Sequence, residues 1–254
     1  RKASVRVRLI LKMEVNKMED NERNEIQNIY DKFHQEFYSQ KFMAIRDALK
    51  SISLREKNNP KHLHDLGKFV IFYSLPTISP KVVIIGDNPS WFQTSNPVLA
   101  EKNLEDVAEK IPTINSYKSH GHKFGNQIID VFNAIGRENW LDEIVGLNRF
   151  WIQTGGGGTT ELKDECKKNG QLFLYEEIKH LCEKYTKDLV KLLNPNLVIL
   201  LGKKAQNIYK PIVNNSFYNP NRRSFIFAIH PARGKWRQTA SEIDTFLNEN
   251  EINY

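Results

Sequence analysis

Cysteine is scarce in this chain. Only Cys166 and Cys182 occur among 254 residues. Two thiols are too few for a disulfide framework, a four-cysteine zinc site or a four-cysteine iron–sulfur cluster. Their spacing also fits no metal-ligand pattern. We therefore expect two ordinary thiols, a reducing intracellular compartment and no bound metal.

Long apolar runs are missing as well. The densest runs, Val82–Ile85 and Leu197–Leu201, have the length of a strand, whereas a membrane helix needs about 20 apolar residues. We expect a soluble protein that does not enter a membrane. Residues 1–12 are basic, but their apolar part is too short and too interrupted for a secretory signal. We interpret residues 1–20 as a basic leader, disordered or foreign to the natural chain, whose start would then be Met13 or Met18.

Positive charge exceeds negative charge, with 37 Lys and Arg against 30 Asp and Glu and a formal net charge of +7. This excess favours encounters with polyanions, and nucleic acid is the leading partner class. Many mildly basic proteins bind no nucleic acid, so the charge alone does not decide. The length suits one large domain, and we expect a monomer.

The hydrophobic pattern predicts an α/β protein. Residues 21–51 have apolar positions near a 3.6-residue period, which predicts a helix, and a charged connection follows from residue 53. The rest alternates apolar, strand-like runs with helical patterns. The predicted strands are Lys81–Ile85, Glu143–Leu147, Leu197–Leu201 and Ser224–Ile229, and the predicted helices are Asn126–Ile135, Gln171–Leu193, Lys203–Val213 and Arg237–Glu249.

This alternation is typical of a three-layer α/β/α fold with a central four-stranded, mostly parallel sheet. We expect residues 21–75 to form a helical extension packed on the core and residues 76–254 to form the α/β domain. Ligands of open α/β sheets bind outside the carboxyl ends of the strands. That rule selects the segments 87–92, 148–158 and 230–236 as candidate site loops.

The first of these segments follows a strand and contains a turn with polar side chains. It reads Gly86-Asp87-Asn88-Pro89-Ser90-Trp91-Phe92. Glycine allows close backbone approach and proline stiffens the turn, so Asn88 or Asp87 could be held still to orient a water. Trp91 or Phe92 could stack on a base. Taken alone, the segment favours a plain Asn-Pro turn without chemistry over a site, because Asn-Pro is a common turn dipeptide.

The segment after the fourth strand combines an imidazole with cations and an aromatic ring. It reads His230-Pro231-Ala232-Arg233-Gly234-Lys235-Trp236-Arg237. Arg and Lys side chains suit phosphates, and a large side chain can enter a gap in a base stack. Taken alone, the segment favours a hydrogen-bonded surface histidine at His230 and a solvated face for the cations.

Together, the two motifs resemble the uracil-DNA glycosylase superfamily. A strand with Gly-x-Asn-Pro precedes, by about 140 residues, a strand with His-Pro and a small residue. The resemblance covers about residues 80–236 and leaves residues 1–60 unaligned. It implies a DNA glycosylase of base excision repair that flips uracil, or a related damaged or mismatched base, out of single- or double-stranded DNA and hydrolyses its N-glycosidic bond. It implies neither a metal nor an organic cofactor.

The resemblance also assigns roles. It implies that Asn88 positions the hydrolytic water and that His230 donates a hydrogen bond to uracil O2, while the neighbouring Asp87 remains a catalytic candidate. Asn148, which follows the second strand, matches a family Asn whose amide reads the uracil edge; it could also simply end the strand. The remaining candidates are Gly86, Ser90 and Phe92 for the base and Pro231, Arg233, Lys235 and Trp236 for DNA.

Two departures leave alternatives open. Asn88 stands where the most active uracil-specific enzymes have Asp, and this resembles the mismatch-specific and single-strand-selective branches. Ser90 stands where the uracil-specific branch has Tyr, which predicts relaxed base choice. A second hypothesis is therefore a weak or inactive glycosylase-fold module that binds DNA or protein. A third is a nucleotide-binding protein that uses the Gly155–Gly158 tract, although we interpret that tract as a flexible loop because it lacks a P-loop pattern.

Overall fold

The computed structural model describes residues 21–56, 72, 74, 76–87, 123–154, 158–210, 216, 223–232 and 234–252. Residues 21–37 are helical. The other helices are η1 (Gln40–Phe42), α2 (Met43–Glu56), α5 (Lys123–Ala134), η2 (Glu138–Asp142), α6 (Gly158–Lys168), α7 (Leu172–Leu193), α8 (Gly202–Gln206) and α9 (Trp236–Glu249). The strands are β1 (Val82–Gly86), β2 (Ile144–Asn148), β3 (Leu197–Leu201) and β4 (Ser224–Ala228).

The four strands form one parallel sheet in the order β2-β1-β3-β4. Val82 pairs with Ile144 on one side and with Leu197 on the other, so the three strands start level. The chain leaves β1 for β2 in one direction and returns across β1 to β3. The predicted α/β class with a central four-stranded sheet is thus confirmed, and every strand pairing is parallel.

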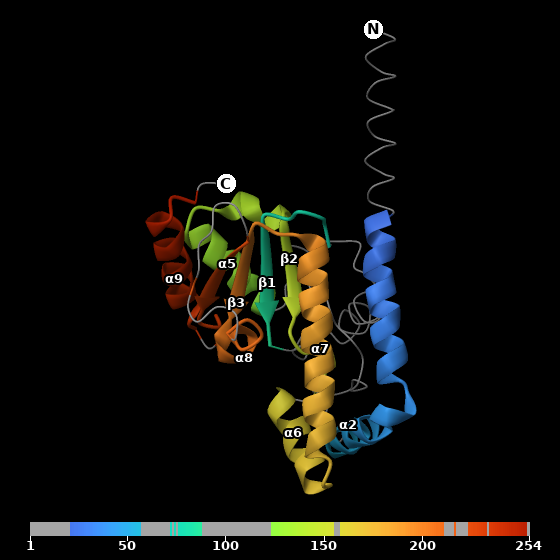
Figure 1. Cartoon of the computed structure of the whole chain (residues 1–254). Coiled ribbons are helices and arrows are strands. Elements are labelled where there is room, and N and C mark those ends of the chain that lie inside the picture. The colour runs from blue at the N-terminus through green and yellow to red at the C-terminus, as the bar shows by residue number, and fades with distance from the viewer. Residues whose placement is uncertain are drawn as a thin grey trace, which may run out of the picture.

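Helices cover both faces of the sheet, which explains why its strands are apolar without alternation. Alternate residues such as Val83 and Ile85 belong to one core cluster with α2, α6 and α7. Their neighbours Val82 and Ile84 belong to a second cluster with α5 and α9. Figure 1 shows these two helical layers around the strands, with α7 and the N-terminal helix side by side.

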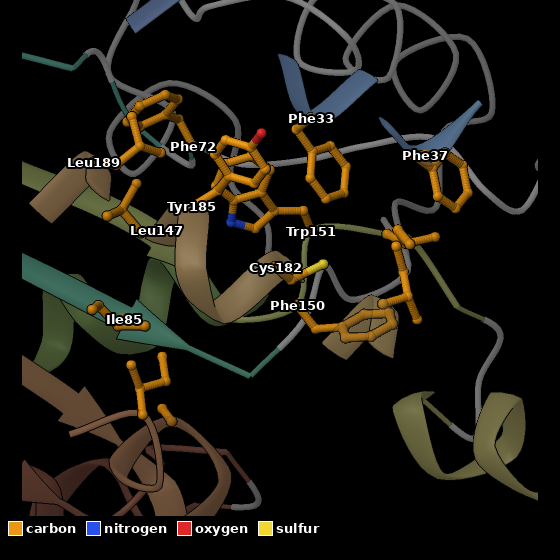
Figure 2. Packing of buried hydrophobic residues seen from close by; sticks show 14 of the residues in the cluster. Phe33, Phe37, Phe72, Ile85, Leu147, Phe150, Trp151, Cys182, Tyr185 and Leu189 are labelled. Atoms are coloured by element: carbon orange, nitrogen blue, oxygen red, sulfur yellow. The ribbon is translucent and has the colours of Figure 1, made fainter. Parts of the chain in front are cut away.

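The helix over residues 21–37 packs into the same core as the sheet. Phe33 is fully buried, and its ring centroid lies 4.6 Å from that of Trp151 and 5.9 Å from that of Tyr185. Trp151 donates its indole N–H to Thr186 Oγ1 at 2.9 Å. Figure 2 shows these rings packed at an angle to one another near Cys182 of α7. The N-terminal helix therefore completes one face of the sheet.

The prediction of one continuous helix over residues 21–51 is wrong, because the helix is interrupted at Ser39. Ser39 is extended, with φ −61° and ψ 162°, and its hydroxyl donates to the Glu36 carbonyl at 2.6 Å. Arg46 of α2 donates to the carbonyls of Phe37 and Ser39. These bonds satisfy carbonyls that a continuous helix would satisfy itself.

Other boundaries differ by a few residues. Asn148 is the last residue of β2 rather than the first residue of a loop. Gly158 begins α6, so the expected flexible loop does not extend to it, and the helix Gly158–Lys168 was not predicted. The helix predicted as Lys203–Val213 ends at Gln206, with a turn up to residue 210.

Within the described part of the chain, no helix is both long and apolar enough to cross a membrane.

Candidate functional site

The candidate site lies at the carboxyl edge of the sheet, which we define as the strand ends at Gly86, Asn148, Leu201 and Ala228. The strand order reverses between β1 and β3, and ligands of open α/β sheets bind outside such a point. Parallel strands end on the same edge, so the residues that follow them share it.

Asn148 and Gly86 are register partners at the end of β2 and β1. Asn148 is fully buried. A Cβ built on Gly86 would lie 3.9 Å from Asn148 Oδ1, so the amide lies beside the glycine backbone. The Thr186 hydroxyl of α7 lies 2.9 Å from the Cys182 carbonyl, one turn earlier in α7, and 3.2 Å from the Asn148 carbonyl, so it shares its proton between the helix and the strand end. The end of β2 is thereby fixed against α7.

Asp87, which follows Gly86, is bound by the buried Arg149, which follows Asn148. Arg149 Nε and Nη2 both donate to Asp87 Oδ1, at 3.1 and 2.8 Å, and Nη1 donates to Glu183 Oε1 of α7 at 2.6 Å. The Arg149 side chain is only 4% exposed. The backbone continues the pairing: Arg149 N donates to Gly86 O at 2.9 Å, and Phe150 N donates to Asp87 O at 2.7 Å.

The second oxygen of Asp87 faces α6 and α8. Lys204 Nζ lies 2.9 Å from Asp87 Oδ2 and donates to Thr159 Oγ1 at 2.7 Å. Thr159 in turn donates to Asp87 Oδ2 at 3.5 Å. We call Asp87, Arg149, Glu183, Thr159 and Lys204 the Asp87 cluster. It joins the ends of β1, β2 and β3 across the point where the strand order reverses.

Electrostatics favours the charged form of Arg149. Burial works against the charge and would lower its pKa, but the carboxylates of Asp87 and Glu183 outweigh burial, so the pKa is raised. Arg149 therefore stays a cation that holds two carboxylates.

His230 follows β4 and is held by uncharged neighbours. The Ala232 backbone N–H donates to His230 Nδ1 at 3.2 Å, so Nδ1 is an acceptor and a neutral imidazole carries its proton on Nε2. The Phe124 ring of α5 stacks on the imidazole, with centroids 5.3 Å apart and an interplanar angle of 28°. Burial lowers the pKa of His230, although Asp87 acts in the opposite direction. The imidazole is thus a preformed neutral donor.

Gly202 lies directly against His230. It has φ +82°, and a Cβ built on it would come within 3.2 Å of His230 Cβ. The residue before His230 is fixed from α9: Ile229 N donates to Glu242 Oε2 at 2.6 Å, and Thr239 Oγ1 donates to Ile229 O at 2.9 Å. Backbone and side-chain contacts therefore hold His230 on several sides.

The residues after His230 are partly exposed. Pro231 is buried, whereas Lys235 and Arg237 are exposed. Trp236 is half-buried against the core cluster of α5 and α9, and the Arg237 guanidinium lies 4.7 Å from its ring centroid. The structure thus gives Trp236 a packing contact in addition to its predicted role toward DNA.

Several predicted site residues lie outside the described residues. They are Asn88, Pro89, Ser90, Trp91, Phe92, Arg233 and Gly155–157. The structure brings Gly86, Asp87 and Asn148 together at adjacent strand ends and places His230 on the same edge.

Sequence reasoning missed the remaining members of the site. Arg149 gave a usable signal, because a charge directly after a buried strand needs a partner. Thr159, Lys204 and Phe124 come from three different helices, and no sequence pattern links them.

Among the residues described, no group of three His, Cys, Asp or Glu side chains could hold a metal ion. Comparison with protein-family models gave no match to this chain, and comparison with curated proteins also gave none.

Proposed function

We propose that this protein is a DNA glycosylase of the uracil-DNA glycosylase type, which hydrolyses the N-glycosidic bond of uracil or a related damaged or mismatched base. The observation that carries the proposal is the shared edge. Asn148 ends β2 and His230 lies two residues after the end of β4, so residues about 80 positions apart in the chain share the edge on which β1 ends at Gly86, before Asn88.

The state of His230 suits the reaction. Breaking the bond leaves negative charge on the departing base, and a fixed donor stabilises that charge most strongly in the transition state. A neutral imidazole with Nδ1 occupied by the Ala232 N–H offers its Nε2–H for this purpose. The lowered pKa of His230, caused by burial, keeps it neutral near pH 7.

Asn148 suits recognition of the base. Its amide has both a donor and an acceptor, which is what N3–H and O4 of uracil require. It lies buried against the Gly86 backbone, so a base that is read by it must leave the DNA stack first. In this proposal, Asn88 orients the attacking water.

Exposed cations supply the attraction to DNA. Lys203 and Lys204 follow β3, and Lys235 and Arg237 follow β4, all on the carboxyl edge. Cations at one edge can contact successive phosphates and offset the few kcal/mol that base flipping costs.

Oligonucleotides with one uracil test the proposal. Single strands, U·A duplexes and U·G duplexes are incubated with the protein, treated with alkali and run on a denaturing gel, with thymine-containing strands of the same sequence as controls. We expect a cleaved product from uracil strands only or, with relaxed base choice, also from T·G duplexes.

Two results would contradict the proposal. Binding of these strands without any abasic product would favour an inactive glycosylase-fold module. Tight binding of a free nucleotide, with no binding of DNA, would favour the nucleotide-binding alternative.

A further inference from the structure

The carboxylate of Asp87 is fully engaged. Oδ1 accepts two N–H groups of Arg149, at 3.1 and 2.8 Å, and Oδ2 lies 2.9 Å from Lys204 Nζ. A proton acceptor in hydrolysis needs an oxygen that can approach the attacking water. Each oxygen already has two donors, because Oδ2 also accepts the Thr159 hydroxyl at 3.5 Å, so an attacking water would have to displace one of them.

The same contacts fix the chain where the proposed site begins. Two backbone hydrogen bonds extend the β1–β2 pairing at the Asp87–Arg149 ion pair. They run from Arg149 N to Gly86 O and from Phe150 N to Asp87 O. Side chain and backbone therefore hold Asp87 from two directions. Gly86 directly precedes Asp87 and Asn148 directly precedes Arg149, so a displacement of the ion pair would move the Asn148 amide away from the Gly86 backbone.

A second ion pair joins the same two strands at their other ends and offers a matched comparison. Lys81 precedes β1 and Glu143 precedes β2, and their charged atoms lie 2.9 Å apart. These side chains are 25% and 51% exposed, against 4% and 22% for Arg149 and Asp87. The buried pair thus lies only at the end that carries the candidate site.

We propose that the Arg149–Asp87 ion pair is a positioning device that holds the Asn148 amide at the end of β2 beside the Gly86 end of β1, and that Asp87 acts through this contact rather than on the substrate. This inference rests on the proposed function. It removes Asp87 from the candidate proton acceptors and adds Arg149 as a positioning residue. A misplacement of about 1 Å can lower a rate by about 100-fold, so a loss of this pair should affect turnover.

Three variants test the proposal: Asp87→Asn, Arg149→Lys and the control Glu143→Gln. Arg149→Lys keeps the positive charge and leaves the Asp87 carboxylate intact, but a lysine cannot bridge Asp87 and Glu183 as the planar guanidinium does. We expect both Asp87→Asn and Arg149→Lys to lower kcat on uracil DNA by about 10-fold to 100-fold, with KM changed less than about threefold. The double variant should lose no more than the worse single variant, because both remove one interaction. Glu143→Gln should keep kcat within about twofold.

Hydrogen exchange supplies a readout that does not depend on activity. In Asp87→Asn and Arg149→Lys, the amides of Arg149 and Phe150 should exchange at least about 10-fold faster, while those of β3 keep their protection. Glu143→Gln should leave the Arg149 and Phe150 amides unchanged. If Arg149→Lys does not fold, Asp87→Asn alone gives the exchange result.

The outcomes separate the two ideas. If wild-type protein releases no base, the proposed function fails, and the exchange result alone decides the positioning role. If Arg149→Lys keeps full kcat while Asp87→Asn loses it, Asp87 acts directly and the positioning proposal is overturned. Unchanged exchange in both variants would overturn it as well.

Discussion

Two regions of the carboxyl edge hold their candidate residues by different physical means. At β1 and β2, the Asp87 cluster uses charges: a buried guanidinium between two carboxylates, closed by Lys204. At β4, His230 is held by the stacked Phe124 ring, the Ala232 N–H and the close Gly202 backbone. Both arrangements hold side chains of the same edge in place.

The difference has a chemical consequence. An ion-pair cluster keeps its members charged, as the raised pKa of Arg149 indicates, because the nearby carboxylates outweigh burial. An apolar and backbone enclosure keeps its member neutral, because burial lowers the pKa of His230. The charged end therefore suits positioning, and the neutral end suits hydrogen-bond donation to a developing anion.

The largest effect should come from Arg149→Ala, which leaves the half-buried Glu183 without its cation and leaves Asp87 with only the more exposed Lys204. Breaking one side of a buried charge pair costs about 3–5 kcal/mol of unfolding free energy. Urea denaturation followed by circular dichroism measures it. Lys81→Ala, which breaks the more exposed pair with Glu143, should cost at most about 1 kcal/mol. Equal losses of unfolding free energy in the two variants would mean that the Asp87 cluster contributes no more to stability than the more exposed Lys81–Glu143 pair.

His230→Ala should affect the reaction rather than the fold. Loss of a donor to a developing oxyanion lowers kcat by about 100-fold to 1000-fold, whereas affinity for uracil DNA should change little, since this bond strengthens in the transition state. Single-turnover rates and fluorescence anisotropy with a labelled oligonucleotide measure the two quantities. An unchanged rate would exclude His230 from the mechanism.

Gly202→Ala tests whether the enclosure of His230 matters. The new Cβ would come within 3.2 Å of His230 Cβ, at a φ of +82° that costs about 1–2 kcal/mol for a residue with a side chain. Gly136→Ala is the matched control, because Gly136 has φ +66° and nothing within 4 Å of a built Cβ. Both variants should lose similar stability in urea, and only Gly202→Ala should lower kcat. A matching fall in both rates would indicate a general effect of backbone strain.

Sequence reasoning located the sheet well because both of its faces are covered. Buried parallel strands need continuous apolar runs, and Leu197–Leu201 was predicted with its observed bounds. For the other three strands, the predicted bounds differ from the observed bounds by one residue. The helix break at Ser39 was not predicted, because it depends on hydrogen bonds from Arg46 to the Phe37 and Ser39 carbonyls. The helix Gly158–Lys168 was not predicted either, because it follows a glycine tract.

The site was predictable only in part, for a related reason. Asp87 and His230 follow apolar strands and Asn148 ends one, so the rule for carboxyl ends selects them without any contact information. Arg149, Thr159 and Lys204 belong to the site because they pair with Asp87, from which each is 62 or more positions away in the sequence. Such pairing follows from the tertiary structure, which no local pattern encodes.

Lys204→Met should have a small effect on stability. The Lys204 side chain is 47% exposed, so water screens its ion pair with Asp87, and exposed pairs contribute about 0–1 kcal/mol. Lys203→Met removes the same charge from the neighbouring exposed position and serves as control. The unfolding free energies of the two variants, measured by urea denaturation, should differ by less than about 1 kcal/mol. A loss near that of Arg149→Ala would show that the outer cation carries as much of the cluster's stability as the inner one.

The smallest expected effect is an absence of change, in the dependence of activity on pH. The pKa of His230 is lowered by burial from its ordinary value of about 6.5, so the folded imidazole stays neutral as the pH falls to 6.5 and somewhat below. Activity that needs the neutral donor should therefore stay flat through pH 6.5 and fall only at the lower, folded pKa. Stability should respond at a higher pH than activity does. Below about pH 6.5 the His230 side chain of the unfolded protein binds a proton while that of the folded protein does not, so the unfolding free energy begins to decrease there. An NMR titration of the His230 ring, assigned with His230→Gln, measures the pKa directly. A midpoint at or above 6.5 would mean that the neighbouring Asp87 carboxylate, rather than the apolar enclosure, controls this histidine.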